Sequence, residues 1–589
     1  MPYQFSDALD DELLYERVET FGSGMDGFTR ATLLAADASQ YLENVLISDN
    51  LVARTRPGAD TLSAAPNGAA VIGISYFDTP DYQQLIACSG GKLYAYEGGA
   101  WAELAGFSGL DAYEAAQGVD KLLISDGTAH CRSFDGVTFT DLGNTTGSTT
   151  SDPPVGTTIL CWHAGRMFAA GAALGRDTIY ASFLLEFGSG KWNHTNFSMR
   201  VGGGEGEAIV ALVSLQNYYL AVLKDSSVYL VNTDPTAANA AAWAVQKVSG
   251  GVGCVGKKAW CLYANDLLFM ARDGVRSLKR MQAAAGQFDI SPPLSQPLQP
   301  WIERINWAYG STIAAVSFRE LCFFAVPIDS ATTPDTVLVY NARLQCWLGV
   351  WTNWAPGCWA VSRFNAIQAL NFGEAGGLVR KWKYGADAAD DATYLDDGAA
   401  IPTKVWTRGF LFGEPVNDKD GYHAEARFSA SNALVNFTLL ADAAELRTWS
   451  VDLRQEGVGL PVDLPFDLAD PTAQVARRGL RGLRAWNEAY LKIESTAGWW
   501  VLRNVSVSAY LNMLKNEDRS RGATADDTSG TTTGSTPARP ETWTMLGMTW
   551  RENAAGLVQV LDEGAGGDGK WHTVRMVDGQ LQWATEGEE

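Results

Sequence analysis

The chain has 589 residues, 46% of them hydrophobic, and its formal net charge is −22. This hydrophobic fraction provides for a packed core and excludes global disorder, while the negative charge repels a nucleic-acid backbone and argues against a DNA-reading protein. The 60 glycines and 21 tryptophans indicate many tight turns and many aromatic side chains between sheets, as an all-β chain requires.

The eight cysteines show neither a CxxC pair nor zinc-ligand spacing, so we expect buried free thiols in a protein made in a reducing cytoplasm. The chain opens on an acidic stretch rather than on the basic region of a signal peptide. Its most apolar window, residues 208–223, is interrupted by Gln216 and Asn217 and is too short to span a bilayer. We therefore expect no integral membrane segment, and we interpret this window as a pair of core strands.

Residues 1–70 differ in pattern from the rest of the chain. They suggest a short acidic helix at residues 7–18 and a second helix-like segment at residues 35–44, followed by two short strands that end near residue 58. Arg54 and Arg56 fit the solvated edge of a strand, and an anionic contact is the alternative.

From residue 71 to about residue 386 one pattern recurs at roughly forty-residue spacing: an apolar strand, a glycine-containing turn, an alternating strand and an aromatic residue. The copies lie at residues 82–107, 120–143, 160–199, 210–232, 260–280, 317–326 with 340–354, and 359–385. In the clearest copy an alternating strand at residues 337–341 precedes a polar turn at residues 342–345 and a strand bearing Trp347, Trp351 and Trp354. Such a unit cannot bury both faces alone, so the repeats predict a β-propeller of six or seven blades.

A proline-rich insert at residues 291–300 and a helix-like run after it interrupt the repeats, and such inserts often lie on a rim where a partner binds. After residue 398 the predicted strands become longer, among them separate strands at residues 423–431 and 434–441, which is typical of a β-sandwich. The predicted organisation is an N-terminal extended or helical segment (1–70), a β-propeller (71–398), a β-sandwich (399–514), a flexible linker (515–540) and a small C-terminal β appendage (541–589).

A local basic cluster lies within the predicted sandwich of this acidic chain. It consists of Arg477, Arg478, Arg481 and Arg484. We expect a solvated loop whose arginines pair with nearby aspartates, and a contact surface is the alternative.

Short motifs of known chemistry are absent or incomplete. Residues 564–570 match the phosphate-binding pattern GxxxxGK, but Trp571 replaces the hydroxyl residue and a strand-like segment follows, which predicts a hairpin loop. The glycine-rich residues 202–206, the Asp-Gly stretch at residues 133–139 and the fragment of a calcium-loop pattern at residues 418–421 are all interpreted as turns. The five histidines are scattered. A pair of glycosidase carboxylates needs only proximity in space and stays possible, but the sequence predicts no catalytic, cofactor-binding or metal-binding residue and no enzyme.

Two stretches resemble the tail nozzle proteins of short-tailed bacteriophages, also called tail tubular or packaged-DNA stabilisation proteins. They are Leu42-Glu43-Asn44 followed by residues 51–58 (LVARTRPG), and Val339-Tyr340-Asn341 continuing through Trp347 to Trp354. The resemblance covers residues 40–510 in architecture, and the C-terminal appendage falls outside it. It implies a virion protein, made in the host cytoplasm, whose propeller-bearing subunits form a ring of six below the portal and its adaptor.

Such a nozzle extends the DNA channel, retains the packaged genome, takes part in DNA ejection and carries fibres or spikes. An acidic channel suits this role, because it lets double-stranded DNA pass without sequence-specific binding. Two other functions stay open at this point: a peripheral tail or receptor-binding propeller that binds surface glycans, and a propeller glycosidase or lyase.

Overall fold

The structure is a computed structural model in which the chain forms two compact units, residues 1–516 and 517–589. It describes residues 13–583 except for 64–65, 105–108, 129–130, 144–149, 173–174, 286–290, 389, 414–417, 443, 455–473, 482, 512–541, 546–547, 553–557, 562–570 and 578–579. The predicted linker at residues 515–540 therefore lies outside the described residues.

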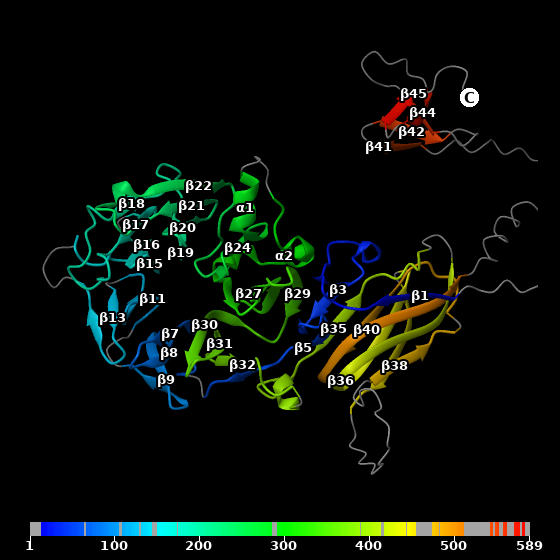
Figure 1. Cartoon of the computed structure of the whole chain (residues 1–589), viewed down its shortest axis with the longest axis horizontal. Coiled ribbons are helices and arrows are strands. Elements are labelled where there is room, and N and C mark those ends of the chain that lie inside the picture. The colour runs from blue at the N-terminus through cyan, green and yellow to red at the C-terminus, as the bar shows by residue number, and fades with distance from the viewer. Residues whose placement is uncertain are drawn as a thin grey trace, which may run out of the picture. The chain divides into compact units, whose positions relative to one another are not determined.

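The predicted repeats form the blades of a β-propeller (Figure 1). Blade 1 contains β7 (Val71–Asp78), β8 (Gln83–Ser89), β9 (Lys92–Glu97) and β10 (Ala100–Glu103), and blade 2 contains β11 (Glu114–Gly118), β12 (Lys121–Ser125), β13 (Arg132–Phe134) and β14 (Phe139–Asp141). Blade 3 contains β15 (Ile159–His163), β16 (Arg166–Ala170), β17 (Thr178–Ala181) and β18 (Ser198–Arg200), and blade 4 contains β19 (Ile209–Ser214), β20 (Tyr219–Lys224), β21 (Ser227–Asn232) and β22 (Ala244–Gly250). The apolar window at residues 208–223 is thus a pair of core strands, as predicted.

Blade 5 contains β23 (Trp260–Tyr263), β24 (Asp266–Ala271) and β25 (Gly274–Ser277). The next unit of the ring is the meander β26 (Ala314–Phe318), β27 (Leu321–Val326), β28 (Thr336–Asn341) and β29 (Cys346–Trp351). The last blade contains β30 (Pro356–Phe364), β31 (Ile367–Glu374), β32 (Val379–Trp382) and, from the N-terminal segment, β6 (Ala59–Thr61). Among the described residues six blades are separate sheets, while the β26–β29 meander continues into a second sheet region.

The first strands of the blades surround the centre of the propeller. They lie next to one another from β7 through β11 and β15 to β19, and from β23 through β26 and β30 back to β7. The ring is closed by hydrogen bonds between β32 and β6, which pair Trp382 with Ala59 and Arg380 with Thr61. A strand from the start of the chain therefore completes the blade that is finished last.

The predicted hairpin around residues 337–354 is confirmed. β28 and β29 are antiparallel and flank the polar turn at residues 342–345. Trp347, Trp351 and Trp354 are all fully buried, so these indoles fill the space beside the sheet as the sequence pattern indicates. Gly349 of β29 has φ +88°, and a Cβ there would lie 2.1 Å from the carbonyl oxygen of Leu42. Only glycine therefore allows β29 to approach β3 (Ala38–Glu43), the strand that contains Leu42.

The second sheet region, which corresponds to the predicted sandwich, is joined to the propeller by backbone pairing. It contains β1 (Leu13–Val18), β2 (Gly24–Met25), β3 (Ala38–Glu43), β4 (Val45–Ile47), β5 (Ala53–Thr55), β35 (Thr403–Thr407), β36 (Lys419–Ala441), β37 (Ala444–Asp452), β38 (Gln474–Gly479), β39 (Ala489–Ser495) and β40 (Gly498–Leu511). β3 pairs with β29 through Val350 and Glu43, so one hydrogen-bonded sheet extends from the β26–β29 meander into this region.

β36 differs from the sequence prediction, which placed separate strands at residues 423–431 and 434–441. The segment between them makes no turn, because Ser431 to Ala433 pair with Trp500 to Gly498 of β40. The first half of β36 pairs with β40 and β38, and its second half pairs with β39 and β37. This one long strand therefore connects β38 and β40 with β37 and β39 in one hydrogen-bonded sheet.

The helices predicted in the N-terminal segment are wrong where the structure describes them. Residues 35–44 include the strand β3, and residues 13–18 of the predicted acidic helix form β1, which pairs with β40. Residues 38–43 form a strand despite their helix-like spacing, because β2, β29 and β35 all form hydrogen bonds with β3. The remaining part of the acidic helix, residues 7–12, lies outside the described residues.

Short helices and a two-stranded ribbon fill the connections. They are η1 (Ala31–Leu33), η2 (Ala240–Ala242), α1 (Leu278–Ala285), η3 (Gln296–Leu298), α2 (Gln299–Ile302), η4 (Trp307–Thr312), η5 (Asp391–Tyr394), β33 (Leu395–Asp396) and β34 (Ala399–Ala400). η3 and the start of α2 lie within the proline-rich insert, and the end of α2 and η4 follow it, where a helix-like run was predicted. Within the described part of the chain we find no helix with the length and apolar character needed to cross a membrane.

The second unit is a separate antiparallel sheet. It contains β41 (Thr542–Met545), β42 (Met548–Glu552), β43 (Val558–Leu561), β44 (Trp571–Val577) and β45 (Gln580–Trp583). The all-β character predicted for this appendage is confirmed.

Candidate functional site: a buried arginine clamp

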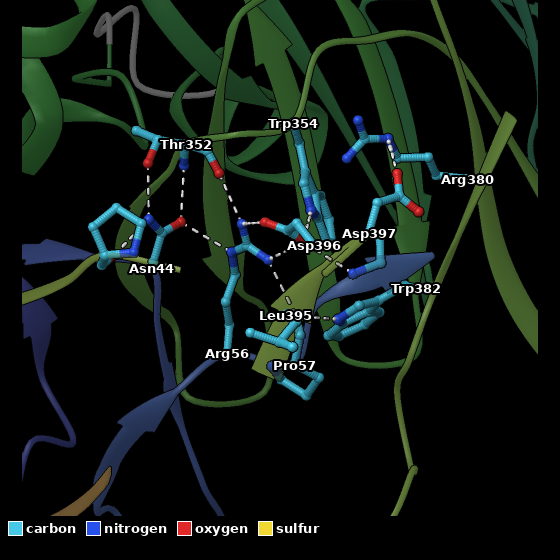
Figure 2. A network of polar contacts seen from close by, with 12 residues as sticks. Asn44, Arg56, Pro57, Thr352, Trp354, Arg380, Trp382, Leu395, Asp396 and Asp397 are labelled. Atoms are coloured by element: carbon cyan, nitrogen blue, oxygen red, sulfur yellow. Dashed lines mark hydrogen bonds and ion pairs between the residues drawn. The ribbon is translucent and has the colours of Figure 1, made fainter. Parts of the chain in front are cut away.

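Two segments far apart in sequence meet at a buried polar network between the propeller and the second sheet region (Figure 2). Arg56 comes directly after β5, and its partner Asp396 lies on β33, 340 residues later. Thr352 and Trp354 come from the segment that leaves β29, and Asn44 lies between β3 and β4. We call the contacts of these five residues the arginine clamp.

Arg56 uses all five of its N–H donors in the clamp. Its Nη1 and Nη2 atoms donate to Oδ1 and Oδ2 of Asp396 at 3.1 and 2.8 Å, and its Nε donates to Asn44 Oδ1 at 2.9 Å. The other two bonds go to the backbone carbonyls of Pro57 at 3.2 Å and Thr352 at 2.8 Å. The side chains of Arg56 and Asp396 are 0% and 2% exposed, so this two-pronged ion pair is fully removed from water.

The Asp396 carboxylate is equally well supplied with donors. Besides Arg56, its Oδ1 accepts hydrogen bonds from the backbone N–H of Ala59 and from Nε1 of Trp354, both at 2.9 Å. A buried ion pair is tolerated only when such additional bonds satisfy its remaining polar atoms, because desolvation opposes the attraction between the charges. The clamp meets this condition, and losing either partner would leave the other charge buried and unpaired.

Asn44 connects the clamp to the second sheet region. Its Nδ2 donates to Thr352 Oγ1 and to the carbonyl of Pro402, both at 2.8 Å, and its Oδ1 also accepts the Thr352 N–H at 2.9 Å. The Arg56 guanidinium lies 4.6 Å from the ring centre of Trp354, a distance at which a cation and an aromatic ring attract each other. One asparagine and one arginine thus tie together the N-terminal segment, the end of β29 and the residues that enter β35.

A second charged group lies beside the clamp (Figure 2). The Nε atom of Arg380 lies 3.3 Å from Glu374 and 3.2 Å from Asp397. Burial raises the pKa of Glu374, and the nearby Arg380 partly opposes that rise. Trp382 Nε1 donates to the Pro57 carbonyl at 3.1 Å, so the last blade is also fastened to the segment that carries Arg56.

The clamp corrects the expectation for Arg56, which was a solvated strand edge. The side chain is buried and makes the anionic contact that was the alternative interpretation. Arg54 is half-buried on β5, and its Nε has no hydrogen-bond partner. The clamp also joins residues of the two stretches on which the family resemblance depends, since Asn44 and Arg56 belong to one and Thr352 and Trp354 belong to the other.

The basic cluster lies partly on a strand rather than in a loop, because Arg477 and Arg478 belong to β38. Arg477 pairs with a glutamate, Glu425 of β36, at 3.6 Å rather than with an aspartate. The guanidinium of Arg481 lies 5.5 Å from the ring centre of Tyr422. These contacts leave the contact-surface interpretation open.

The other motifs have structural roles where they are described. The Asp135 side chain accepts bonds from the backbone N–H groups of Val137 and Thr138, which makes residues 133–139 the predicted turn. Residues 202–206 also form a turn, and Glu205 there pairs with Lys247 at 2.6 Å. The turn predicted at residues 418–421 is wrong, because β36 begins at Lys419. The GxxxxGK loop lies outside the described residues, and β44 follows it as predicted.

All eight cysteines are buried and free, as expected from their spacing. Over the residues with a described placement, no group of three histidine, cysteine or acidic side chains is arranged to hold a metal ion.

Comparisons with known proteins add little to this geometry. No protein-family model and no curated protein matches the sequence. Among solved structures, the crystal structure of the computationally designed Ika8 protein is similar over 55% of this chain and 99% of that one, with 12% identity and a TM-score of 0.34. A similarity of this size carries no functional argument.

Asp396 lies two residues before the predicted end of the propeller, and no role was predicted for it. Its role depends on a partner 340 residues away, and no local spacing reveals such a pair. The run of Asp396, Asp397 and Gly398 at a domain boundary is the one local signal that pointed to this place.

Proposed function

We propose that this chain is a structural virion protein, a subunit of the tail nozzle of a short-tailed bacteriophage. The single observation that carries the proposal is the arginine clamp, because it brings together the two separate stretches that resemble the nozzle family. Patterns that are remote in sequence and meet in one buried network are more specific than either pattern alone. The proposed role is assembly, without catalysis and without a cofactor.

The physical properties of the chain are consistent with this role. A ring subunit must keep its parts in a fixed orientation, and here one continuous sheet and the clamp join the propeller to the second sheet region. In the proposal, copies of the chain form a closed ring, expected to be a hexamer, through heterologous interfaces. The ring would extend the DNA channel below the portal-side adaptor, retain the genome until ejection and carry fibres or spikes.

The net charge of −22 supports a channel subunit whose surface does not bind DNA tightly. Binding to a duplex is driven by cationic side chains that release counterions from the phosphates. We expect no measurable affinity of the purified chain for a labelled DNA duplex at about 0.15 M salt. Tight binding under these conditions would contradict the channel role.

Imaging of assemblies tests the proposal most directly. The full chain, alone and mixed with the portal-side adaptor, should form closed rings in electron micrographs, and in the virion its copies should surround the tail axis. A chain that stays monomeric in both samples, or whose copies lie away from the axis, would refute the nozzle assignment. Envelope polysaccharide binding in such a peripheral location would favour a receptor-binding propeller instead.

A further inference from the structure

A pocket of about 370 Å³ lies among the first strands of five blades. β7, β11, β23, β26 and β30 and the residues just before β11 and β23 supply its walls, and β7 lies next to β11 and β30, as β26 does to β23 and β30. Pockets for small molecules start at about 300 Å³. The space therefore suits one small organic molecule and is large for a bare inorganic ion.

The charge in this pocket is opposite to that of the whole chain. Its charged lining residues are Lys257, Lys258 and Glu114, which gives two cations and one carboxylate in a chain whose net charge is −22. Lys257 Nζ lies 3.3 Å from Glu114 Oε2, and Lys258 Nζ donates to the Ile72 carbonyl at 2.8 Å. An ammonium group has three N–H donors, so each lysine keeps donor capacity for an anion.

Glu114 is the one acidic residue among the described residues that line the pocket. Burial raises the pKa of its carboxyl group, and the two neighbouring lysines oppose this rise without cancelling it. The Lys257 and Glu114 side chains are 33% and 21% exposed, so solvent and a small solute reach the pair.

The aromatic residues of the pocket have already used their polar atoms. Trp260 Nε1 donates to the Lys257 carbonyl at 2.9 Å, Trp359 Nε1 donates to the Ala314 carbonyl at 3.2 Å, and the Tyr113 hydroxyl is bonded to a serine of β7. These residues therefore offer a ligand mainly ring surface, on which an apolar or sugar-ring face can pack.

We call this space among the first strands the axial pocket. We propose that the axial pocket binds a small sugar carboxylate, such as a single uronic acid. The lysine ammonium groups would bind its carboxylate, the aromatic rings would pack against the pyranose ring, and Glu114 and Ser317 would accept or donate bonds at its hydroxyls. The assignment depends on the pocket alone and is independent of ring assembly.

Isothermal titration calorimetry of the full chain tests this assignment with glucuronate, glucose and inorganic phosphate at equal ionic strength. We expect binding of glucuronate, with much weaker binding of glucose and phosphate. Glucose binding as tightly as glucuronate would overturn the role of the lysines, and phosphate doing so would overturn the role of the ring. A lack of glucuronate binding would overturn the whole proposal.

Variants locate the binding. Lys257→Gln should weaken glucuronate binding about tenfold to a hundredfold, since a hydrogen bond to a charged group is lost. Lys191→Gln is the matched control, because Lys191 pairs with Glu186 at 2.8 Å on the surface of the same propeller, and it should leave affinity unchanged. Glu114→Gln should strengthen binding by releasing Lys257 from its partner. Circular dichroism should first show that both variants are folded. Unchanged affinity in folded K257Q, or weaker glucuronate binding in folded E114Q, would then refute the assignment of glucuronate to this pocket.

Discussion

Replacing Arg56 with methionine tests whether the clamp joins the parts of the first unit. The side chain keeps its approximate volume, but Asp396 then stays buried with only the Ala59 N–H and the Trp354 indole as donors. Because the two charged side chains are 0% and 2% exposed, solvent does not screen the loss. Removing one partner of such a pair costs about 3–5 kcal/mol.

The free energy of opening is measured by hydrogen–deuterium exchange of peptides that cover residues 44–61 and 352–402. Local exchange is preferable to a single unfolding transition, because a unit of this size does not unfold in one step. Adding Asp396→Asn to the R56M protein should recover part of the loss, since the stranded charge is neutralised.

The matched control is Arg200→Met. Arg200 also contacts both oxygens of an aspartate, Asp177, but its side chain is 67% exposed, so its loss should have a much smaller effect. If R56M and R200M change local exchange equally, the clamp does not have the stabilising role assigned to it here.

Three further predictions concern other parts of the chain. Burial raises the pKa of Cys88, Cys131 and Cys254 to about 12. A thiol reagent at pH 8 should therefore label none of the eight buried cysteines in the native protein and all of them in denaturant, and rapid labelling of the native protein would contradict their burial. Gly349→Ala should destabilise the junction of β29 and β3 by more than about 1 kcal/mol, measured as faster exchange in residues 38–43, whereas Gly98→Ala in an open turn should leave this junction unchanged. Because the folded-state pKa of Glu114 is raised above the unfolded value of about 4.3, its proton stabilises the fold below that value and this contribution is lost as the pH rises through the folded pKa. The local stability of the wild type relative to E114Q, taken from the exchange of residues 114–118 relative to intrinsic exchange rates between pH 4 and 8, should therefore fall with rising pH, and a rise would show the opposite shift.

The blades could be predicted from the sequence because their signals are local. Alternating apolar residues, turns such as Asp-Gly and Gly-Gly, and aromatic residues recur among the copies, as Asp135, Gly136 and Trp351 illustrate. The N-terminal strands could not be predicted in this way. The spacing of Ala38, Tyr41 and Leu42 suits a helix, and only the pairing of β3 with β29 and β35 makes this segment a strand.

The clamp and the axial pocket could not be predicted from local sequence patterns, because their residues are far apart in the sequence. An arginine beside a short strand normally indicates solvent exposure. Burial of Arg56 depends on an aspartate and two tryptophans that come about three hundred residues later in the sequence, at the end of the propeller segment. Glu114 begins the first strand of one blade and Lys257 lies just before the first strand of another, and no sequence interval relates them.

The pairing of β6 with β32 also governs how the polypeptide acquires its fold during translation. Residues 59–61 leave the ribosome long before residues 379–382, so the propeller stays an open arc, with its final edge unpaired, until more than three hundred further residues have been synthesised. Contacts of such large sequence separation form slowly, and until they form the unpaired strand edge can pair with other strands or chains. Nascent chains arrested before residue 379 should therefore be sensitive to proteases in the last blade, and completion of the ring should coincide with the gain of resistance.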